Sequence, residues 1–342
     1  MHRLKLNPFN GLYAFSENLG RSLAKMGGPE EELHYYLPLE KFGFFGDRFA
    51  YENHRSIDKF YKFGTEKFDV WHATTTISWY RPFNKRTKFL FTIHDLNFLL
   101  EEKELVTRNK NLLKRIQRSV DRAAYVVCIS NYSMRIAEEM LKMGDKPRCV
   151  IHNGCIINTF PDFDEPVYRP KRPFLFALGL VQPRKNFHLL PALLKDTDLE
   201  LVIAGLDHYE YKRTIEAEIR KYGVEDRVHF TGGISEQDKH WYYQHCEAFL
   251  LPSYAEGFGL PVIEAMYYGK PVFLSRESCL PETGGDAAYY FNSFDPDDMR
   301  QTFAKGLAHY REHDPAEKIR RQAAMFSWDK AAESYLQIYR SL

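Results

Sequence analysis

The chain has 342 residues, which is long enough for two domains that each bury a core. Its 47 basic and 46 acidic side chains nearly cancel, so overall charge gives no attraction to nucleic acid and we expect no such partner. No apolar run approaches the roughly 18–20 residues that span a bilayer, the first residues lack a signal peptide's apolar core, and five cysteines without a CxxC pair indicate reduced thiols in a cytoplasmic protein.

Strand-like runs alternate with helix-like segments in the first half of the chain, a pattern typical of α/β proteins with parallel sheets. The expected strands are 68–72, 88–94 and 124–130, and the expected helices are 108–122 and 132–143. A first strand ordinarily precedes a turn such as Asn10–Gly11, and only Arg3–Leu6 is available for it. We therefore expect that strand to be short, or the chain to start late.

A second series of apolar runs begins near Phe174 and predicts a second α/β domain. Its expected strands are 174–178, 199–204, 228–231, 248–251 and 271–274, and its expected helices include 210–222 and 236–245. The polar, proline-bearing stretch 160–173 is interpreted as the linker between the domains. Because open α/β sheets bind ligands beyond the carboxyl ends of their strands, we expect the site in a cleft there.

The stretch from Ser253 to Val272 is the most informative part of the sequence. Glu256 lies in a glycine-rich loop after the strand at 248–251, and Glu264 lies on the second turn of the short helix that follows. The glycines let the backbone approach a ligand closely. A helix N-terminus offers unpaired N–H groups and partial positive charge to an anion. This arrangement favours a ligand that carries phosphate beside several hydroxyls, such as a sugar nucleotide.

With this loop, the chain resembles the retaining glycosyltransferases of the two-Rossmann-domain (GT-B) fold, in family 4 (group 1) of bacterial sugar transferases. The resemblance runs from Tyr13 to Tyr339 and is densest between residues 174 and 288. It implies two Rossmann-like α/β domains whose parallel sheets face a central cleft. The acceptor-side domain would span 1–163, with a final helix at 326–342 packing back onto it, and the nucleotide-sugar domain would span 172–325.

In that family the first glutamate lies beside the donor sugar and the second holds the ribose hydroxyls. The resemblance therefore gives Glu256 a catalytic role and Glu264 a donor-binding role, since carboxylates accept strong hydrogen bonds from vicinal hydroxyls. The backbone amides of the loop between them would also grip the donor, at Gly257, Phe258, Gly259 and Leu260. The alternative is a helix-dipole glutamate and a solvated loop glutamate.

The segment Gly179–Asn186 follows the first strand of the second domain and carries two basic residues, Arg184 and Lys185. Lys185 matches the family's lysine that neutralises the donor diphosphate. The family's usual arginine position is Leu180 here, so Arg184 is assigned to the phosphate in its place; a solvated basic turn is the alternative. Lys, Arg and backbone N–H groups can stabilise a leaving diphosphate without a metal. We expect no metal and no cofactor, with a GDP- or UDP-linked sugar as substrate.

The segment Thr92–Asp95 closes an apolar strand, so we expect His94 to open into the cleft. It resembles the family's histidine near the transferred sugar, although a His-Asp pair after a strand can also be structural. The resemblance implies further donor-site positions: Gly11 would leave room for phosphate and acceptor, Gly205 would face the cleft, and the backbone near Ile234 would read the nucleobase.

The segment 108–122 holds six basic residues and one acidic residue, and its apolar residues recur at helical spacing. Two interpretations stay open for it. One is an ordinary amphipathic helix that faces the core and has a solvated polar side. The other is attraction to anionic lipid, which would place the protein peripherally on the inner face of the cytoplasmic membrane.

The function that the resemblance implies is transfer of a hexose, of mannose, galactose or glucose type, from a nucleotide-diphosphate sugar to a hydroxyl. The acceptor would be a lipid-linked or growing glycan in bacterial polysaccharide synthesis, such as O-antigen, lipopolysaccharide or capsule. Retention without an obvious carboxylate nucleophile suggests front-face attack. Two alternatives stay open: a sugar-nucleotide epimerase or phosphorylase on the same fold, and a non-catalytic glycan-assembly partner.

Overall fold

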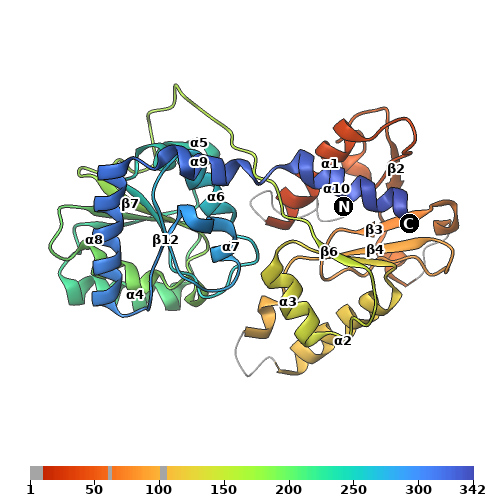
Figure 1. Cartoon of the computed structure of the whole chain (residues 1–342), viewed down its shortest axis with the longest axis horizontal. Helices are drawn as coiled ribbons and strands as arrows, with labels where there is room; N and C mark the ends of the chain where they lie inside the picture. Colours follow the sequence, from red (N-terminus) through yellow and green to blue (C-terminus); the bar gives the residue numbers. More distant parts are fainter. Residues whose placement is uncertain (1–10, 61–63, 101–105) are drawn as a thin grey trace. The chain divides into compact units, whose positions relative to one another are not determined.

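The computed structural model describes residues 11–60, 64–100 and 106–342 (Figure 1). The chain forms two compact units, of which the first contains residues up to Ile156 together with Ser327–Leu342 and the second contains Ile157–Phe326. Every strand pair in the described residues is parallel, which confirms the predicted α/β class. The expected first strand at Arg3–Leu6 lies outside the described residues.

The second unit is built on a six-stranded sheet in the order β12-β11-β10-β7-β8-β9. The strands are β7 (Phe174–Leu178), β8 (Glu200–Ala204), β9 (Val228–Gly232), β10 (Ala248–Leu251), β11 (Val272–Leu274) and β12 (Tyr289–Tyr290). The sheet runs outward in both directions from the pair β7 and β10, where Leu175 lies opposite Ala248. This is the doubly wound order, and its topological switch point lies between these two strands.

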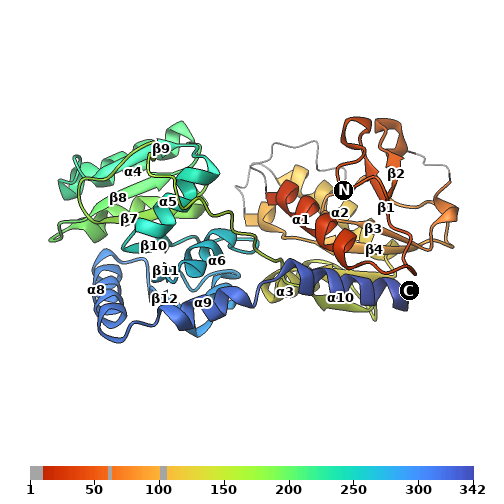
Figure 2. The same cartoon turned by 90° about the horizontal axis from the view of Figure 1, so that it is seen from above.

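Helices cover both faces of this sheet (Figures 1 and 2). They are α4 (Tyr209–Tyr222), α5 (Glu236–His245), α6 (Leu260–Tyr267), α7 (Leu280–Gly284), α8 (Pro296–His313) and α9 (Ala316–Ala324). Local signals set their ends: Ser235 and Asp238 form a capping box at the start of α5, and Gly223 ends α4 in the left-handed conformation. The central strands β7, β8, β10 and β11 are buried on both faces and are almost entirely apolar.

The first unit contains two parallel sheets, β1-β2 and β3-β4-β5-β6. The strands are β1 (His34–Leu37), β2 (Ala50–Asn53), β3 (Val70–Ala73), β4 (Lys88–Ile93), β5 (Tyr125–Cys128) and β6 (Arg148–Val150). The helices are α1 (Gly11–Met26), α2 (Val106–Arg122), α3 (Asn131–Met140) and α10 (Trp328–Ser341). The strands β1, β2, β6 and β12 were not predicted from the sequence, because none of them is a run of aliphatic residues like those that indicated β4, β10 and β11.

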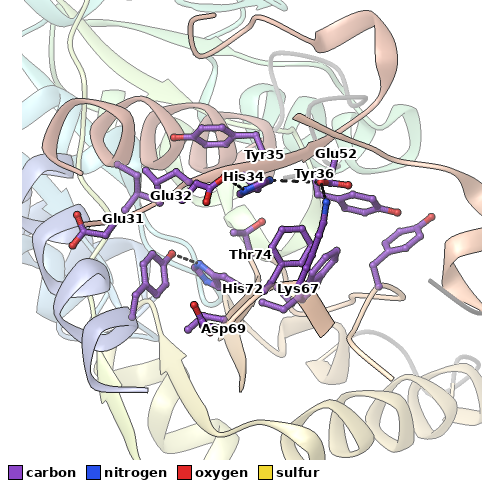
Figure 3. Close-up of a pocket in the computed structure, with 18 of the residues that line it drawn as sticks. Glu31, Glu32, His34, Tyr35, Tyr36, Glu52, Lys67, Asp69, His72 and Thr74 are labelled. Carbon is purple, nitrogen blue, oxygen red and sulfur yellow. Dashed lines mark hydrogen bonds and ion pairs between the residues drawn. The ribbon is translucent and has the colours of Figure 1, made fainter. Parts of the chain in front are cut away.

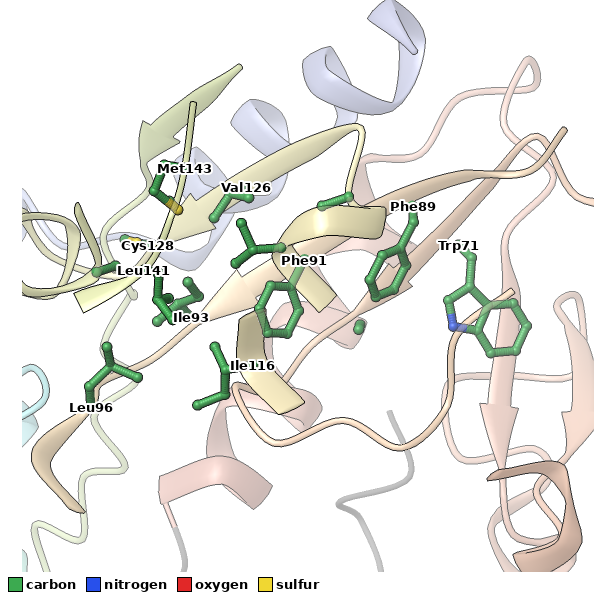
Figure 4. Close-up of a cluster of buried hydrophobic side chains, with 14 of the residues drawn as sticks. Trp71, Phe89, Phe91, Ile93, Leu96, Ile116, Val126, Cys128, Leu141 and Met143 are labelled. Carbon is green, nitrogen blue, oxygen red and sulfur yellow. The ribbon is translucent and has the colours of Figure 1, made fainter. Parts of the chain in front are cut away.

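The core of the four-stranded sheet is formed by β4 and the helix α2 (Figure 4). Phe89 and Phe91 of β4 pack with Ile116 and Val120 of α2, and all four side chains are fully buried. The apolar stripe of the predicted basic segment therefore faces the core, which confirms the amphipathic interpretation for that side of α2. Its basic residues Arg108, Lys110, Lys114 and Arg118 are exposed on the other side.

The last helix belongs to the first unit although it follows the second unit in sequence. A Cβ added at Gly154 would lie 2.1 Å from the backbone nitrogen of Trp328, so the chain can return here only past a glycine. Tyr335 is fully buried, and its hydroxyl pairs with Thr92 Oγ1 at 3.1 Å. His72 bridges Thr92 and Tyr339 with its two ring nitrogens, at 2.8 and 2.7 Å. Burial lowers the pKa of His72 to about 3, so the ring stays neutral in this network.

The stretch 160–173, predicted as the linker between the domains, is grouped with the second unit. The backbone N–H of Val167 donates to Asp238 at 2.8 Å, and the Tyr168 hydroxyl donates to Glu200 at 2.7 Å. The prolines predicted a break in regular structure, which the stretch has. They could not predict that its backbone would be tied to α5 and β8. The chain passes between the units at Ile156–Ile157 and at Phe326–Ser327.

Candidate active site

The doubly wound order of the second sheet brings two predicted site residues together. Lys185 lies in the short 3-10 segment after β7, and Glu256 lies in the loop after β10. Because β7 and β10 are adjacent and parallel, the segments that leave their carboxyl ends meet at the switch point. Lys185 Nζ lies 2.6 Å from Glu256 Oε1, and the two side chains are only 7% and 9% exposed. The alternative of a solvated basic turn is therefore wrong for Lys185.

Two glycines make room for this lysine. Gly179 has φ +146°, and a Cβ there would lie 2.9 Å from Lys185 Nζ. Gly205 has φ +138°, and a Cβ there would lie 2.0 Å from the carbonyl oxygen of Gly179. Neither position can carry a side chain without displacing its neighbour, and both conformations are ones that glycine adopts readily. Gly205 thus follows β8, as predicted. Its lack of a side chain lets the turn that holds Lys185 pass close to it.

Arg184 adds a second positive charge beside Glu256. Its guanidinium donates to the Ala255 carbonyl at 2.8 Å and lies 3.6 Å from Glu256 Oε2. Burial acts to raise the pKa of Glu256, but Lys185 and Arg184 outweigh it and hold that pKa below its usual value. The carboxylate is therefore ionised at neutral pH, and two cations surround one buried anion.

The loop that carries Glu256 is fixed from α7 and the turn before it. The Ser278 hydroxyl accepts from the Glu256 N–H at 3.1 Å, and the Thr283 hydroxyl donates to the Phe258 carbonyl at 2.6 Å. Gly259 then caps α6 in the left-handed conformation, with φ +86°. Sequence reasoning missed Ser278 and Thr283. The only signal for them was a polar run after β11, and such runs also occur in ordinary loops.

The side chain of Phe258 points into the protein. It is 5% exposed, and its ring packs edge-on against Phe326 at 5.5 Å between centroids. Gly257, Phe258, Gly259 and Leu260 were predicted to contact the ligand. At Phe258, such a contact can come only from the backbone, because the side chain is buried. The N-terminus of α6 lies directly after these residues, at Leu260.

Glu264 occupies the second turn of α6, as predicted, and its side chain is 13% exposed. Its Oε1 accepts from Lys239 Nζ at 2.9 Å, and its Oε2 accepts from the Tyr243 hydroxyl at 2.8 Å. Of the two alternatives, the solvated loop glutamate is contradicted by the burial of Glu256, which is 9% exposed. No local pattern in the sequence indicated the two partners of Glu264, which lie on α5. Ile234 lies near the start of that helix, after β9, and is half-buried.

His94 and Gly11 lie in the first unit. His94 follows β4 directly but is buried at 7% exposure, in contrast to the expected open position. Its Nε2 donates to the Thr74 carbonyl at 3.0 Å, which fixes the tautomer, and its ring packs edge-on against Phe15 at 4.4 Å between centroids. Gly11 begins α1, and among the described residues a Cβ there would meet no atom within 4 Å.

A cavity of about 660 Å³ also lies in the first unit (Figure 3). It runs between β1 and β3, and residues such as His34, Tyr36, Trp71 and His72 line it. Acidic residues gather at the end where these strands begin, including Glu31, Glu32 and Asp69. None of the predicted site residues lines this cavity. The cavity follows the facing edges of two strands of separate sheets, whereas α/β ligand sites lie beyond the carboxyl ends of strands.

Comparison with known protein families matches both halves of the chain. Residues 18–158 match the model described as Glycosyltransferase Family 4, and residues 160–324 match the model described as Glycosyl transferases group 1. The chain belongs to the group 1 glycosyltransferases. The second match contains Lys185, Glu256 and Glu264, the residues that the sheet topology and α6 place at the switch point.

Two curated relatives of this glycosyltransferase are mannosyltransferases by their names, and one of them is named for the O-antigen chain. Serotype-specific mannosyltransferase WbdA of Escherichia coli is 35% identical over 176 residues, which are 48% of this chain and 21% of that protein. O-antigen chain mannosyltransferase B of Escherichia coli is 26% identical over 271 residues, which are 73% of this chain and 70% of that protein. The chain thus spans about a fifth of the length of the first relative.

A solved structure shows the same fold over nearly the whole chain. HepE from Anabaena, solved in complex with UDP and glucose, has a TM-score of 0.69 at 14% identity, and the match covers 98% of this chain and 97% of that one. The predicted GT-B fold is therefore confirmed. Among the helices in the described part of the glycosyltransferase, none is both long and apolar enough to cross a bilayer.

Proposed function

We propose that this glycosyltransferase retains anomeric configuration and moves a hexose from a nucleotide-diphosphate sugar to a hydroxyl of a lipid-linked or growing surface glycan. The observation that carries the proposal is the buried pair of Lys185 and Glu256 at the switch point, with the partly exposed Arg184 beside it. A buried carboxylate held ionised between two cations is suited to a site where a second anion, the donor diphosphate, arrives and leaves. The mannosyltransferase relatives favour mannose as the first sugar to test.

The donor contacts follow from the second unit. Lys185 has three N–H donors, of which Glu256 accepts one, so the ammonium can also meet a diphosphate oxygen. The α6 N-terminus, after the left-handed Gly259, offers further N–H groups to the same phosphate. Glu256 would accept hydrogen bonds from hydroxyls of the transferred sugar, and Glu264 from hydroxyls of the ribose.

The chemical step is a substitution at the sugar's anomeric carbon. The acceptor oxygen forms a bond to that carbon on the face that the leaving diphosphate occupied, and the bond from carbon to the phosphate oxygen breaks. The acceptor's proton passes to the departing phosphate oxygen. Lys185 and Arg184 stabilise the charge that grows on the diphosphate, so no metal is required for the step. That His94 orients sugar or acceptor hydroxyls is a further part of the proposal, and it rests on the family resemblance alone.

The test is transfer from GDP- and UDP-linked hexoses to a lipid-linked glycan acceptor in the presence of EDTA, with product configuration read by NMR. We expect an α-linked product from an α-linked donor. Lys185→Met and Glu256→Gln should each lower kcat/KM by about 100-fold or more, the effect of removing one group that stabilises transition-state charge. Lys221→Met, which removes an exposed cation of α4, is the matched control and should act as the wild type.

Two results would contradict this proposal. Transfer within about threefold of wild type in both site variants would remove Lys185 and Glu256 from the reaction. Hydrolysis or epimerisation of the donor without any acceptor would indicate a different enzyme on the same fold.

A further inference from the structure

Both oxygens of the Glu264 carboxylate are held by side chains of the neighbouring helix α5. Lys239 Nζ lies 2.9 Å from Oε1, and the Tyr243 hydroxyl lies 2.8 Å from Oε2. Lys239 and Tyr243 are four residues apart, so they lie on the same face of α5, one turn from each other. Such a two-point grip leaves the carboxylate one orientation in which both bonds are made.

The two side chains that hold Glu264 are largely buried. Tyr243 is 1% exposed, and the Lys239 side chain is 21% exposed. Glu236 shares the same ammonium at 2.9 Å. Burial opposes the charge of Lys239, but Glu264 and Glu236 outweigh it and raise the pKa of Lys239. The lysine is therefore charged at neutral pH.

We propose that Lys239 and Tyr243 are positioning residues that orient Glu264 toward the two ribose hydroxyls of the donor nucleotide; this rests on the donor site proposed above. A carboxylate has about four lone-pair sites, two on each oxygen. Lys239 takes one on Oε1 and Tyr243 takes one on Oε2, so each oxygen keeps one acceptor site. A ribose offers two adjacent hydroxyls, and a carboxylate fixed in this way can accept from both at once.

The consequence is selectivity for a ribonucleotide over a deoxyribonucleotide. A carboxylate that can rotate would satisfy either sugar by turning to the hydroxyl that is present. A fixed carboxylate cannot, and a missing hydroxyl leaves one buried acceptor unmatched. A purely structural tie between α5 and α6 would stabilise the unit without affecting this selectivity.

The experiment measures calorimetric affinity for a nucleoside diphosphate and for its 2′-deoxy counterpart, GDP with dGDP and UDP with dUDP. Wild type should prefer the ribonucleotide by about tenfold or more, the value of one hydrogen bond to a charged group. Lys239→Met and Tyr243→Phe should each reduce that preference to about threefold or less. Lys239→Arg should restore part of that preference. Lys221→Met is the control, and thermal unfolding of each variant reports on folding.

The possible outcomes separate the two proposals. Ribonucleotide binding with an unchanged preference in both variants would overturn the role of Lys239 and Tyr243 while leaving the donor site intact. If wild type binds neither GDP nor UDP, the donor site itself is wrong, and the positioning role fails with it. Should Lys239→Met fold poorly, Tyr243→Phe decides the question alone, because it removes a single hydroxyl.

Discussion

Glu256 and Lys185 can be buried only as a pair. Taking either charge out of water alone is strongly unfavourable, and removing one partner leaves the other uncompensated, at a typical loss of about 3–5 kcal/mol. Arg184, a third of whose side chain is exposed, balances the carboxylate from the solvent side. The same three residues would therefore maintain the fold of the switch point and serve the donor, so changes here should affect stability and activity together.

The pH dependence of stability should report on this pair. The folded-state pKa of Glu256 lies below its ordinary value, so the carboxylate contributes stability above the unfolded pKa of about 4.3. That contribution is lost as the pH falls through the folded pKa. Glu256→Gln should therefore have a lower free energy of unfolding than wild type at pH 7. This difference in free energy should become smaller below about pH 4.

Hydrogen exchange at β7 and β10, followed from pH 7 to pH 3.5 in wild type and in Glu256→Gln, measures this difference in stability. Lys221→Met serves as a control for general loss of charge in the second unit. A difference that is constant across this range would show that the ion pair contributes nothing to it.

The sequence indicated some of the residues that meet near the switch point and missed others for a physical reason. Lys185, Glu256 and Glu264 were selected because they match positions of the family that the chain resembles and lie in segments that follow apolar strands; their roles stay predictions. Lys239 and Ser278 were not found, because their roles depend on α5 and α7 packing beside the loop after β10. His94 was placed correctly after its strand, but its burial against Phe15 could not be predicted, since that contact comes from α1. The catalytic role of His94 stays a prediction.

At the scale of elements, α2 has two distinct sides. Its apolar side packs on β4 through Ile116 and Val120, and its exposed side carries Lys110, Lys114 and Arg118. A basic face of this kind is attracted to anionic lipid by about 1 kcal/mol for each charge near the surface. The apolar side is already occupied, so any membrane contact of α2 would be electrostatic and sensitive to salt.

A vesicle experiment tests that contact. In a co-sedimentation assay with vesicles of phosphatidylglycerol and phosphatidylethanolamine, replacing Lys110, Lys114 and Arg118 with Gln should lower the affinity for the vesicles by about 100-fold. Each substitution removes one charge, and each charge contributes about 1 kcal/mol. The control carries Gln at Lys195, Lys221 and Lys305, three exposed cations of the second unit. Equal loss in both variants, or no loss in the first, would remove α2 as the contact.

The elements themselves were predicted to different degrees. Buried strands such as β4 and β10 were found from their apolar runs, and α4 and α5 from their spacing between strands. Strands such as β6 and β12 lack such a run and depend on neighbours that complete a sheet. The order of the strands around β7 and β10 follows from the crossover connections, which only the structure shows.

At the scale of the molecule, the first unit is completed by the end of the chain. In α10, Ala332, Tyr335 and Leu336 are buried, and Tyr335 joins the network of His72 and Thr92. Tyr335→Ala should lower the stability of the first unit by about 3–5 kcal/mol, the usual cost of removing a large buried aromatic ring. The second unit should be unaffected, because α10 belongs to the other unit.

Hydrogen exchange resolved by segment separates the two expectations. Faster exchange in β3, β4 and β5, with unchanged rates in β7 and β8, is the expected pattern. Tyr310→Phe in α8, which removes a hydroxyl bonded to the Gly269 carbonyl in the second unit, should give the reverse pattern. Slower or equal exchange in the first unit of Tyr335→Ala would contradict the assignment of α10.

The chain passes between the two units twice, at Ile156 and at Phe326. These two points determine how a unit can be exchanged between relatives. The second unit of a mannosyltransferase should be inserted in place of Ile157–Phe326, and residues from Ser327 onward should remain those of the recipient chain. A single junction after Ile156 would join a foreign α10 to a first unit whose Gly154 and His72 are shaped for another helix. Chimaeras with two junctions should therefore fold where those with one junction fail, and the sugar transferred should follow the inserted block.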